Sequence, residues 1–153
     1  MNKRYLVILI ILGFTATSCS PILMPPQEWD EMVYENLAKR ATHEKEFSRL
    51  MDSVNGNPSL ILDTDFILQV MVAHDNAVIA GDTIIETSPP PAREVEYRML
   101  SEAFQAYENG GNMLISGMAA LDREKVTEGL KLLEEYNASM NAFMDYMQSK
   151  QTT

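Results

Sequence analysis

The sequence predicts an all-α fold, an up-down antiparallel four-helix bundle. Apolar residues in the second half of the chain recur in alternating steps of four and three, the spacing that bundle helices need to pack against each other. Short connections at 55–58, 87–91 and 121–122 make each predicted helix an antiparallel neighbour of the one before it. The 153 residues are 46% hydrophobic, which is enough for one small domain, placed at 28–150.

The first helix is expected over 28–54 and ends at Asn55-Gly56-Asn57-Pro58. Glycine suits the left-handed position after a helix, and proline suits the first turn of the next one. The helix carries a loose apolar stripe made of Trp29, Met32, Val33, Leu37, Phe47, Leu50, Met51 and Val54.

The second helix is expected from Pro58 to about Glu86, with Asp63 as an alternative N-cap. Its length, more than twenty residues without a turn, is too great for a β-strand. Its apolar face consists of Ile67, Met71, His74, Val78 and Ile85, widened by Phe66, Val70, Ala73 and Ala77.

The third and fourth helices, from about Ala92 and after the N-cap Asp122, carry the clearest patterns. The stripe of the third helix is Leu100, Phe104, Tyr107, Gly111, Leu114, Met118 and Leu121, beside a row of small residues, Ala103, Ala106, Gly110, Gly117 and Ala120. The stripe of the fourth helix is Val126, Leu130, Leu133, Asn137, Met140, Met144 and Met147, flanked by Leu132, Tyr136, Phe143 and Tyr146.

Gly110 and Gly111 interrupt the third helix with two poor helix formers. The alternating steps of four and three residues continue unchanged across Gly111, which favours one continuous helix over two shorter ones. The missing side chains leave room for a neighbouring helix, a lipid chain or a ligand, and the sequence does not choose among these.

The N-terminus has the pattern of an export signal. Lys3 and Arg4 precede an apolar run at 5–14 that is too short to span a bilayer, and Ala16-Thr17-Ser18 leads to Cys19, the only cysteine. This segment resembles a bacterial lipoprotein signal peptide, which implies cleavage of residues 1–18 and lipidation of Cys19. Residues 19–27, rich in proline, then form a tether of about 25 Å at most. The expected localisation is extracytoplasmic, lipid-anchored to the cell membrane or outer membrane.

The net charge of the chain after cleavage excludes some classes of partner. Removal of residues 1–18 leaves 10 basic and 22 acidic residues, a net charge of about −12. Such a domain is not suited to nucleic acid, whose binding depends on Lys and Arg at phosphates. Electrostatic adhesion to anionic lipid is also disfavoured, so the lipid anchor supplies the membrane association.

Two weak patterns suggest a metal. His43 and His74 fall at similar heights if the first two helices form a hairpin, and with nearby carboxylates they are candidate Zn or Cu ligands. Neither belongs to a Glu-x-x-His arrangement. Met140, Met144 and Met147 are candidate Cu(I) ligands, although methionine also fills helical cores. Two partly buried histidines and a methionine-rich core are the competing interpretations, and no cofactor is expected.

The acidic residues and the absent motifs argue against catalysis. Most acids lie opposite the apolar stripes, and only Glu102 falls between them. The sequence contains no arrangement of nucleophile and base and no phosphate loop. It therefore predicts a non-enzymatic envelope lipoprotein whose helical body binds a partner protein. The alternative is a lipoprotein that binds a small ligand or a metal.

Overall fold

A computed structural model of the chain describes residues 24–151, and within them the fold is all-α. The predicted lipidation site, Cys19, and the predicted cleavage point lie outside the described residues. The α-helices are α1 (Pro26–Gly56), α2 (Thr64–Ile85), α3 (Glu94–Ala120) and α4 (Arg123–Gln151), with two short 3-10 helices, η1 (Pro58–Leu62) and η2 (Pro91–Arg93). No helix among the described residues is both long enough and apolar enough to cross a membrane.

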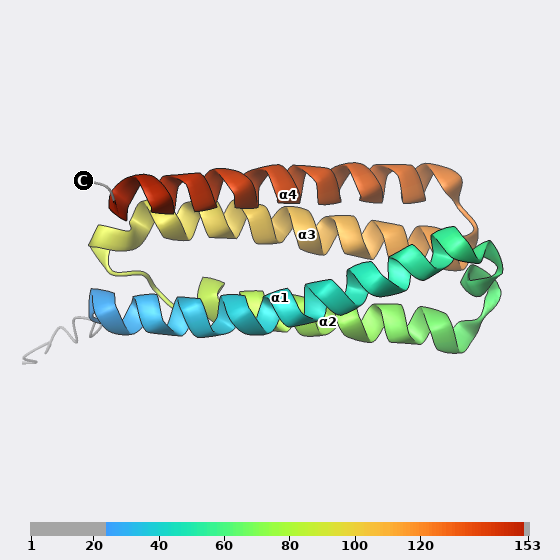
Figure 1. Ribbon diagram of the computed structural model, residues 1–153, viewed down its shortest axis with the longest axis horizontal. Coiled ribbons are helices and arrows are strands. Elements are labelled where there is room, and N and C mark those ends of the chain that lie inside the picture. The colour runs from blue at the N-terminus through green and yellow to red at the C-terminus, as the bar shows by residue number, and fades with distance from the viewer. Residues whose placement is uncertain (1–23, 152–153) are drawn as a thin grey trace, which may run out of the picture.

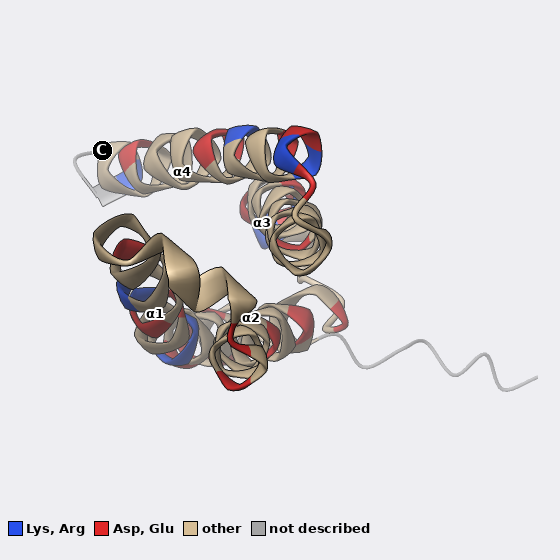
Figure 2. Ribbon diagram, turned by 90° about the vertical axis from the view of Figure 1, so that its right-hand side faces the viewer, with Lys and Arg blue, Asp and Glu red and all other residues tan. Residues whose placement is uncertain are grey.

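The helices pack mainly as two pairs. α1 lies against α2 and α3 lies against α4, and the contact between α2 and α3 joins the pairs. Figure 1 shows the start of α1 and the end of α4 at the same end of the molecule, while Figure 2 looks at the opposite end, where α1 and α4 stand apart. The core extends along the interior in two clusters, one around Trp29, Leu100 and Phe143 and the other around Leu50, Val70 and Leu114.

The predicted stop between the first two helices is confirmed, but its mechanism is different. α1 ends at Gly56, yet no glycine among the described residues has a positive φ, so the predicted left-handed glycine cap is wrong. The chain turns instead at Asn57, whose φ of −145° and ψ of 87° leave the helical region directly before Pro58. The Asn57 side chain accepts a hydrogen bond from the Ser59 amide and so begins η1.

The alternative start of the second helix is confirmed. Asp63 caps α2, because its carboxylate accepts hydrogen bonds from the amides of Asp65 and Phe66 at 2.9 and 3.3 Å. Asp122 caps α4 in the same way, through the amides of Glu124 and Lys125. Between α3 and α4, Leu121 takes the left-handed conformation with φ 53° and is 61% exposed, so its predicted place in the core stripe is wrong.

Helix α3 is continuous through Gly110 and Gly111, as predicted. Gly110 and Gly129 allow α3 and α4 to approach closely, because a Cβ atom on Gly129 would lie 2.7 Å from the Gly110 carbonyl oxygen and 2.6 Å from the Leu114 amide nitrogen. Gly117 meets α4 similarly, at the Val126 amide. Two members of the predicted row of small residues, Gly110 and Gly117, therefore face α4, whereas Ala120 is exposed.

The close approach of α3 and α4 determines which face of α4 is buried. The buried residues are Gly129, Tyr136 and Phe143, spaced by seven, whereas Leu130 and Met144 of the predicted stripe are 47% and 50% exposed and Asn137 is exposed. The predicted centre of the core face is thus wrong by about one residue. The predicted periodicity of α4 is correct. The close contact at the glycines turns the helix so that Tyr136 and Phe143, which flank the predicted stripe, face the core.

Candidate functional site

A buried arginine occupies the middle of the domain. Arg40 of α1 is 1% exposed, and its Nη1 donates a hydrogen bond of 2.9 Å to the Ala77 carbonyl in α2. Its Nε lies 2.6 Å from a carboxylate oxygen of Glu44. The guanidinium carbon lies 4.1 Å from the centre of the Phe104 ring and 4.4 Å from that of Tyr107. These ion-pair and cation–π contacts offset the cost of burying the charge.

Two tyrosines complete the surroundings of this ion pair. Tyr136 of α4 donates a hydrogen bond of 2.5 Å to Glu44, and its ring meets Tyr107 of α3 edge-on at 5.0 Å between centroids. The buried Tyr107 hydroxyl has no hydrogen-bond partner. Burial, and then the negative charge of Glu44, raise the pKa of both phenols, so both remain protonated at neutral pH.

His74 packs beside this ion pair through its ring. The imidazole stacks on Tyr107 at 5.2 Å and lies 5.8 Å from Phe47, with 1% of the residue exposed. It also lies directly over Gly111, where any side chain would collide with it. The space at Gly111 is therefore filled by a side chain of α2. We call Arg40, Glu44, His74, Tyr107 and Tyr136 the central cluster.

The predicted metal candidates lie in different surroundings. His43 is half-buried on α1, whereas His74 is enclosed by aromatic rings. Among the residues that the structure describes, no group of three or more His, Cys, Asp or Glu side chains is placed to hold a metal ion. Met140 and Met147 pack against the core, and Met144 is half-exposed.

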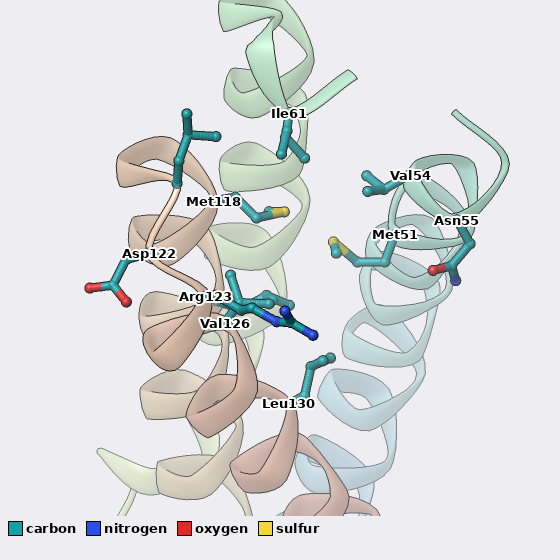
Figure 3. A pocket seen from close by; sticks show the side chains of 12 residues that line it. Met51, Val54, Asn55, Ile61, Met118, Asp122, Arg123, Val126 and Leu130 are labelled. Carbon is teal, nitrogen blue, oxygen red and sulfur yellow. The ribbon is translucent and has the colours of Figure 1, made fainter. Parts of the chain in front are cut away.

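Two neighbouring chambers lie beside the central cluster, between α1, α3 and α4. The middle chamber has a volume of about 310 Å³, and Glu44, Tyr107 and Tyr136 form part of its wall. The end chamber, of about 360 Å³, lies toward η1 and the α3–α4 turn (Figure 3). The residues that line both chambers are Met51, Asn55, Leu114 and Leu130.

The outer face of α2 exposes apolar side chains in a row. We define this α2 face by Leu68, Met71, Val72 and Ile79, which are 51%, 39%, 59% and 62% exposed, together with Leu62 of η1 at 71%. Met71 was predicted to lie on the core side of this helix, and that prediction is wrong. The core side is instead centred on Val70, Ala73 and Ala77.

The buried acid is also different from the one that the sequence suggested. Glu102 is exposed. Glu96 is only 2% exposed and lies 2.5 Å from Lys150 Nζ and 4.0 Å from Arg93. The ion pair with Lys150 joins the end of α4 to the start of α3.

Sequence reasoning missed the central cluster, although its pattern was present. The buried positions of α1 follow steps of four and three that include Arg40, which therefore sits on the apolar stripe, with Glu44 one turn later. A charged residue on an apolar stripe, followed by an opposite charge four residues on, is the pattern that reveals a buried pair. The stripe is Trp29, Val33, Asn36, Arg40, Phe47 and Leu50.

Comparison with family models, curated proteins and solved structures gives no match to this chain.

Proposed function

We propose that this protein is an extracytoplasmic lipoprotein, attached to the membrane through lipidated Cys19, whose helical domain binds a partner protein and has no enzymatic activity. The lipobox-like sequence at 16–19 supports the anchor. The proposed domain is an up-down antiparallel bundle of α1 to α4. A short tether places this domain within about 25 Å of the bilayer, where its exposed surfaces meet other envelope proteins.

The exposed α2 face is the observation that carries the proposal. Its side chains recur at spacings of three, four and seven along one side of a helix whose other side is buried in the core. Soluble domains rarely expose many large apolar side chains on one helix face unless the face serves an interaction; here the exposed Asp75 lies between Val72 and Ile79 in the same row. A row with this spacing fits an amphipathic helix of a partner.

The charges around the α2 face favour a protein over a lipid surface. Residues 64–85 contain no Lys or Arg and contain Asp65, Asp75 and Asp82. An anionic bilayer would repel this rim, whereas a partner with Lys or Arg beside its apolar contact residues would complement it. The proposed partner is therefore a protein with a helical, apolar contact surface bordered by basic residues.

Site-specific photo-cross-linking in the native envelope tests this partner. A photoreactive residue replaces Ile79 in the full-length chain, and the control position is Lys131, 71% exposed on α4. We expect one discrete protein adduct from position 79, absent from position 131 and abolished by Val72→Lys in the same chain. Adducts with lipid alone, or equal adducts from both positions, would contradict the proposal.

The anchor has its own test. Metabolic labelling with a palmitate analogue is expected to label the wild-type chain and to leave Cys19→Ser unlabelled. Release of Cys19→Ser from the membrane fraction would follow, because one acidic domain without an anchor has little affinity for anionic lipid. Labelling that persists in Cys19→Ser would place the lipid elsewhere and refute the assignment.

A further inference from the structure

We propose that the middle chamber binds a linear aliphatic diamine, whose two ammonium groups pair with Glu44 and Asp52 and whose hydrocarbon chain connects them. The chamber lies between α1, α3 and α4. It shares no residue with the α2 face, so this ligand site does not depend on the proposed protein partner.

The lining of the middle chamber selects a cation. Glu44 and Asp52 are the only charged side chains among the described residues that line it. Its other polar side chains include Ser48, Asn55 and Asn137, whose oxygen atoms accept hydrogen bonds from an ammonium group. An anion would be repelled, and an uncharged ligand would leave Asp52 without a counter-charge.

Both carboxylates are accessible to a ligand. Asp52 is exposed, and within the described part of the chain it forms no hydrogen bond or ion pair. The Glu44 side chain is 22% exposed, and its contacts with Arg40 and Tyr136 both use the same oxygen, Oε1. Arg40 approaches from the side of α2, where it binds the Ala77 carbonyl, and it does not line the chamber. The second oxygen of Glu44 is therefore available, and Asp52, which no cation neutralises, attracts the ligand more strongly.

The distance between the carboxylates selects two charges on one chain. Glu44 and Asp52 are separated by about two turns of α1, or about 12 Å along the helix axis. Carboxylates this far apart cannot bind the same metal ion, and among the described residues no group of three or more His, Cys, Asp or Glu is placed to hold one. An ammonium nitrogen lies about 2.8 Å from a paired carboxylate oxygen, so a chain of about six carbons connects the two ion pairs.

Apolar side chains complete the wall and suit the hydrocarbon chain. They include Met51 of α1 and Leu130 and Leu133 of α4. Figure 3 shows the Met51 and Leu130 side chains extending into the space between the two helices. Methylene groups are stabilised against such side chains because they leave water there. The volume of the chamber, about 310 Å³, is in the range of small-molecule sites.

Calorimetric titration of the purified full chain at pH 7 tests the ligand class with three probes: 1,6-diaminohexane, hexylamine and 1,3-diaminopropane. All three are protonated at this pH, as the lysine side chain is, whose pKa is about 10.4. Hexylamine keeps the chain but has one charge, whereas 1,3-diaminopropane keeps both charges but is too short to reach both carboxylates.

We expect 1,6-diaminohexane to bind about fivefold more tightly than either of the other probes, which is the effect of one additional ion pair at a partly exposed site. The absence of 1,6-diaminohexane binding would overturn the proposal. Binding of hexylamine or of 1,3-diaminopropane as tightly as 1,6-diaminohexane would also overturn it, because one charge or the charges alone would then be sufficient.

Substitutions locate the site within the molecule. Asp52→Asn is expected to weaken the binding of 1,6-diaminohexane about fivefold and to bring its affinity close to that of hexylamine. Asp145→Asn removes the same charge from an exposed position of α4 outside the chamber, and it should leave binding unchanged. Equal losses in the two variants would show that only the net charge attracts the diamine, and would refute the site.

A second pair of variants tests the chamber itself. Leu130→Lys places a competing ammonium group on its wall at a residue that is 47% exposed, and it should weaken 1,6-diaminohexane about tenfold. Leu68→Lys makes the same change on α2, at a residue that is 51% exposed, and serves as the control. Unchanged affinity in Leu130→Lys would place the diamine elsewhere and contradict the proposal.

Discussion

The phenol of Tyr136 donates its hydrogen bond to Glu44 and so joins α4 to α1 at the level of the middle chamber. Because Glu44 also pairs with Arg40, one carboxylate connects two helices and neutralises a buried cation. The bond lies at the wall of the cavity rather than outside it, so the same contact that stabilises the fold also shapes the site.

Tyr136→Phe is expected to lower the free energy of unfolding by about 1.5–3 kcal/mol, the usual contribution of a hydrogen bond to a charged group. Urea denaturation at pH 7 measures this loss. Tyr34→Phe, at an exposed tyrosine of α1, serves as the matched control and should change stability by less than about 0.5 kcal/mol. A Tyr136→Phe variant as stable as the control would show that the bond to Glu44 contributes nothing.

Alkaline pH should destabilise the fold through the two buried phenols. Burial raises the pKa of Tyr107 and Tyr136 well above the ordinary value near 10. Above pH 10 the unfolded chain loses these protons and the folded chain keeps them, so stability falls as pH rises, by at most about 1.4 kcal/mol per pH unit for each group. Measured by urea denaturation between pH 9 and pH 11, the free energy of unfolding should fall less steeply with pH in Tyr136→Phe than in wild type. Equal slopes would contradict the buried, protonated assignment.

Gly111→Ala is expected to destabilise the protein by about 1–2 kcal/mol. The added methyl group collides with the His74 imidazole, which aromatic neighbours hold in place, and overpacking of this kind costs more than the helix propensity gained. Gly56→Ala is the control, because its Cβ meets nothing within 4 Å. In a double-mutant cycle, His74→Ala should relieve the cost of Gly111→Ala. Additive effects would show that the two residues do not meet.

Arg40→Lys is expected to lower the free energy of unfolding by about 2–4 kcal/mol, although lysine keeps the positive charge. Lysine cannot keep both the bond to the Ala77 carbonyl and the stacking on Phe104, and the partly buried carboxylate of Glu44 then loses the close contact with the guanidinium. Arg49→Lys makes the same change in an exposed ion pair with Glu46, and there the free energy of unfolding is expected to fall by less than about 0.5 kcal/mol. Thermal and urea unfolding of both variants provide the comparison. Similar losses in the two would mean that burial of Arg40 is unimportant.

The parts of the fold that could be predicted depend on local rules. Asp63 and Asp122 cap helices because a short acidic side chain reaches the free amides of the next turn. Pro58 ends α1 because the residue before a proline avoids the helical conformation. The continuity of α3 through Gly110 and Gly111 followed from the unchanged spacing of its apolar residues.

The candidate site was less predictable, since it depends on contacts between distant parts of the chain. His74 and Gly111 were both noticed in the sequence, but nothing local indicated that one fills the space of the other. Arg40 sits on the apolar stripe of α1, which could have marked it as buried. The unpaired Tyr107 hydroxyl is visible only once its neighbours are in place.

The sequence by itself determined the helices, the caps of α2 and α4 and the spacing of the apolar residues, because propensity, capping and periodicity act within a few residues. The tertiary structure decided which face of α4 is buried. Gly129 lies so close to Gly110 that α4 rotates Tyr136 and Phe143 inward and leaves Leu130, Asn137 and Met144 outside the core. Periodicity defines several faces of an apolar helix, and only the fit of two backbones selects one of them.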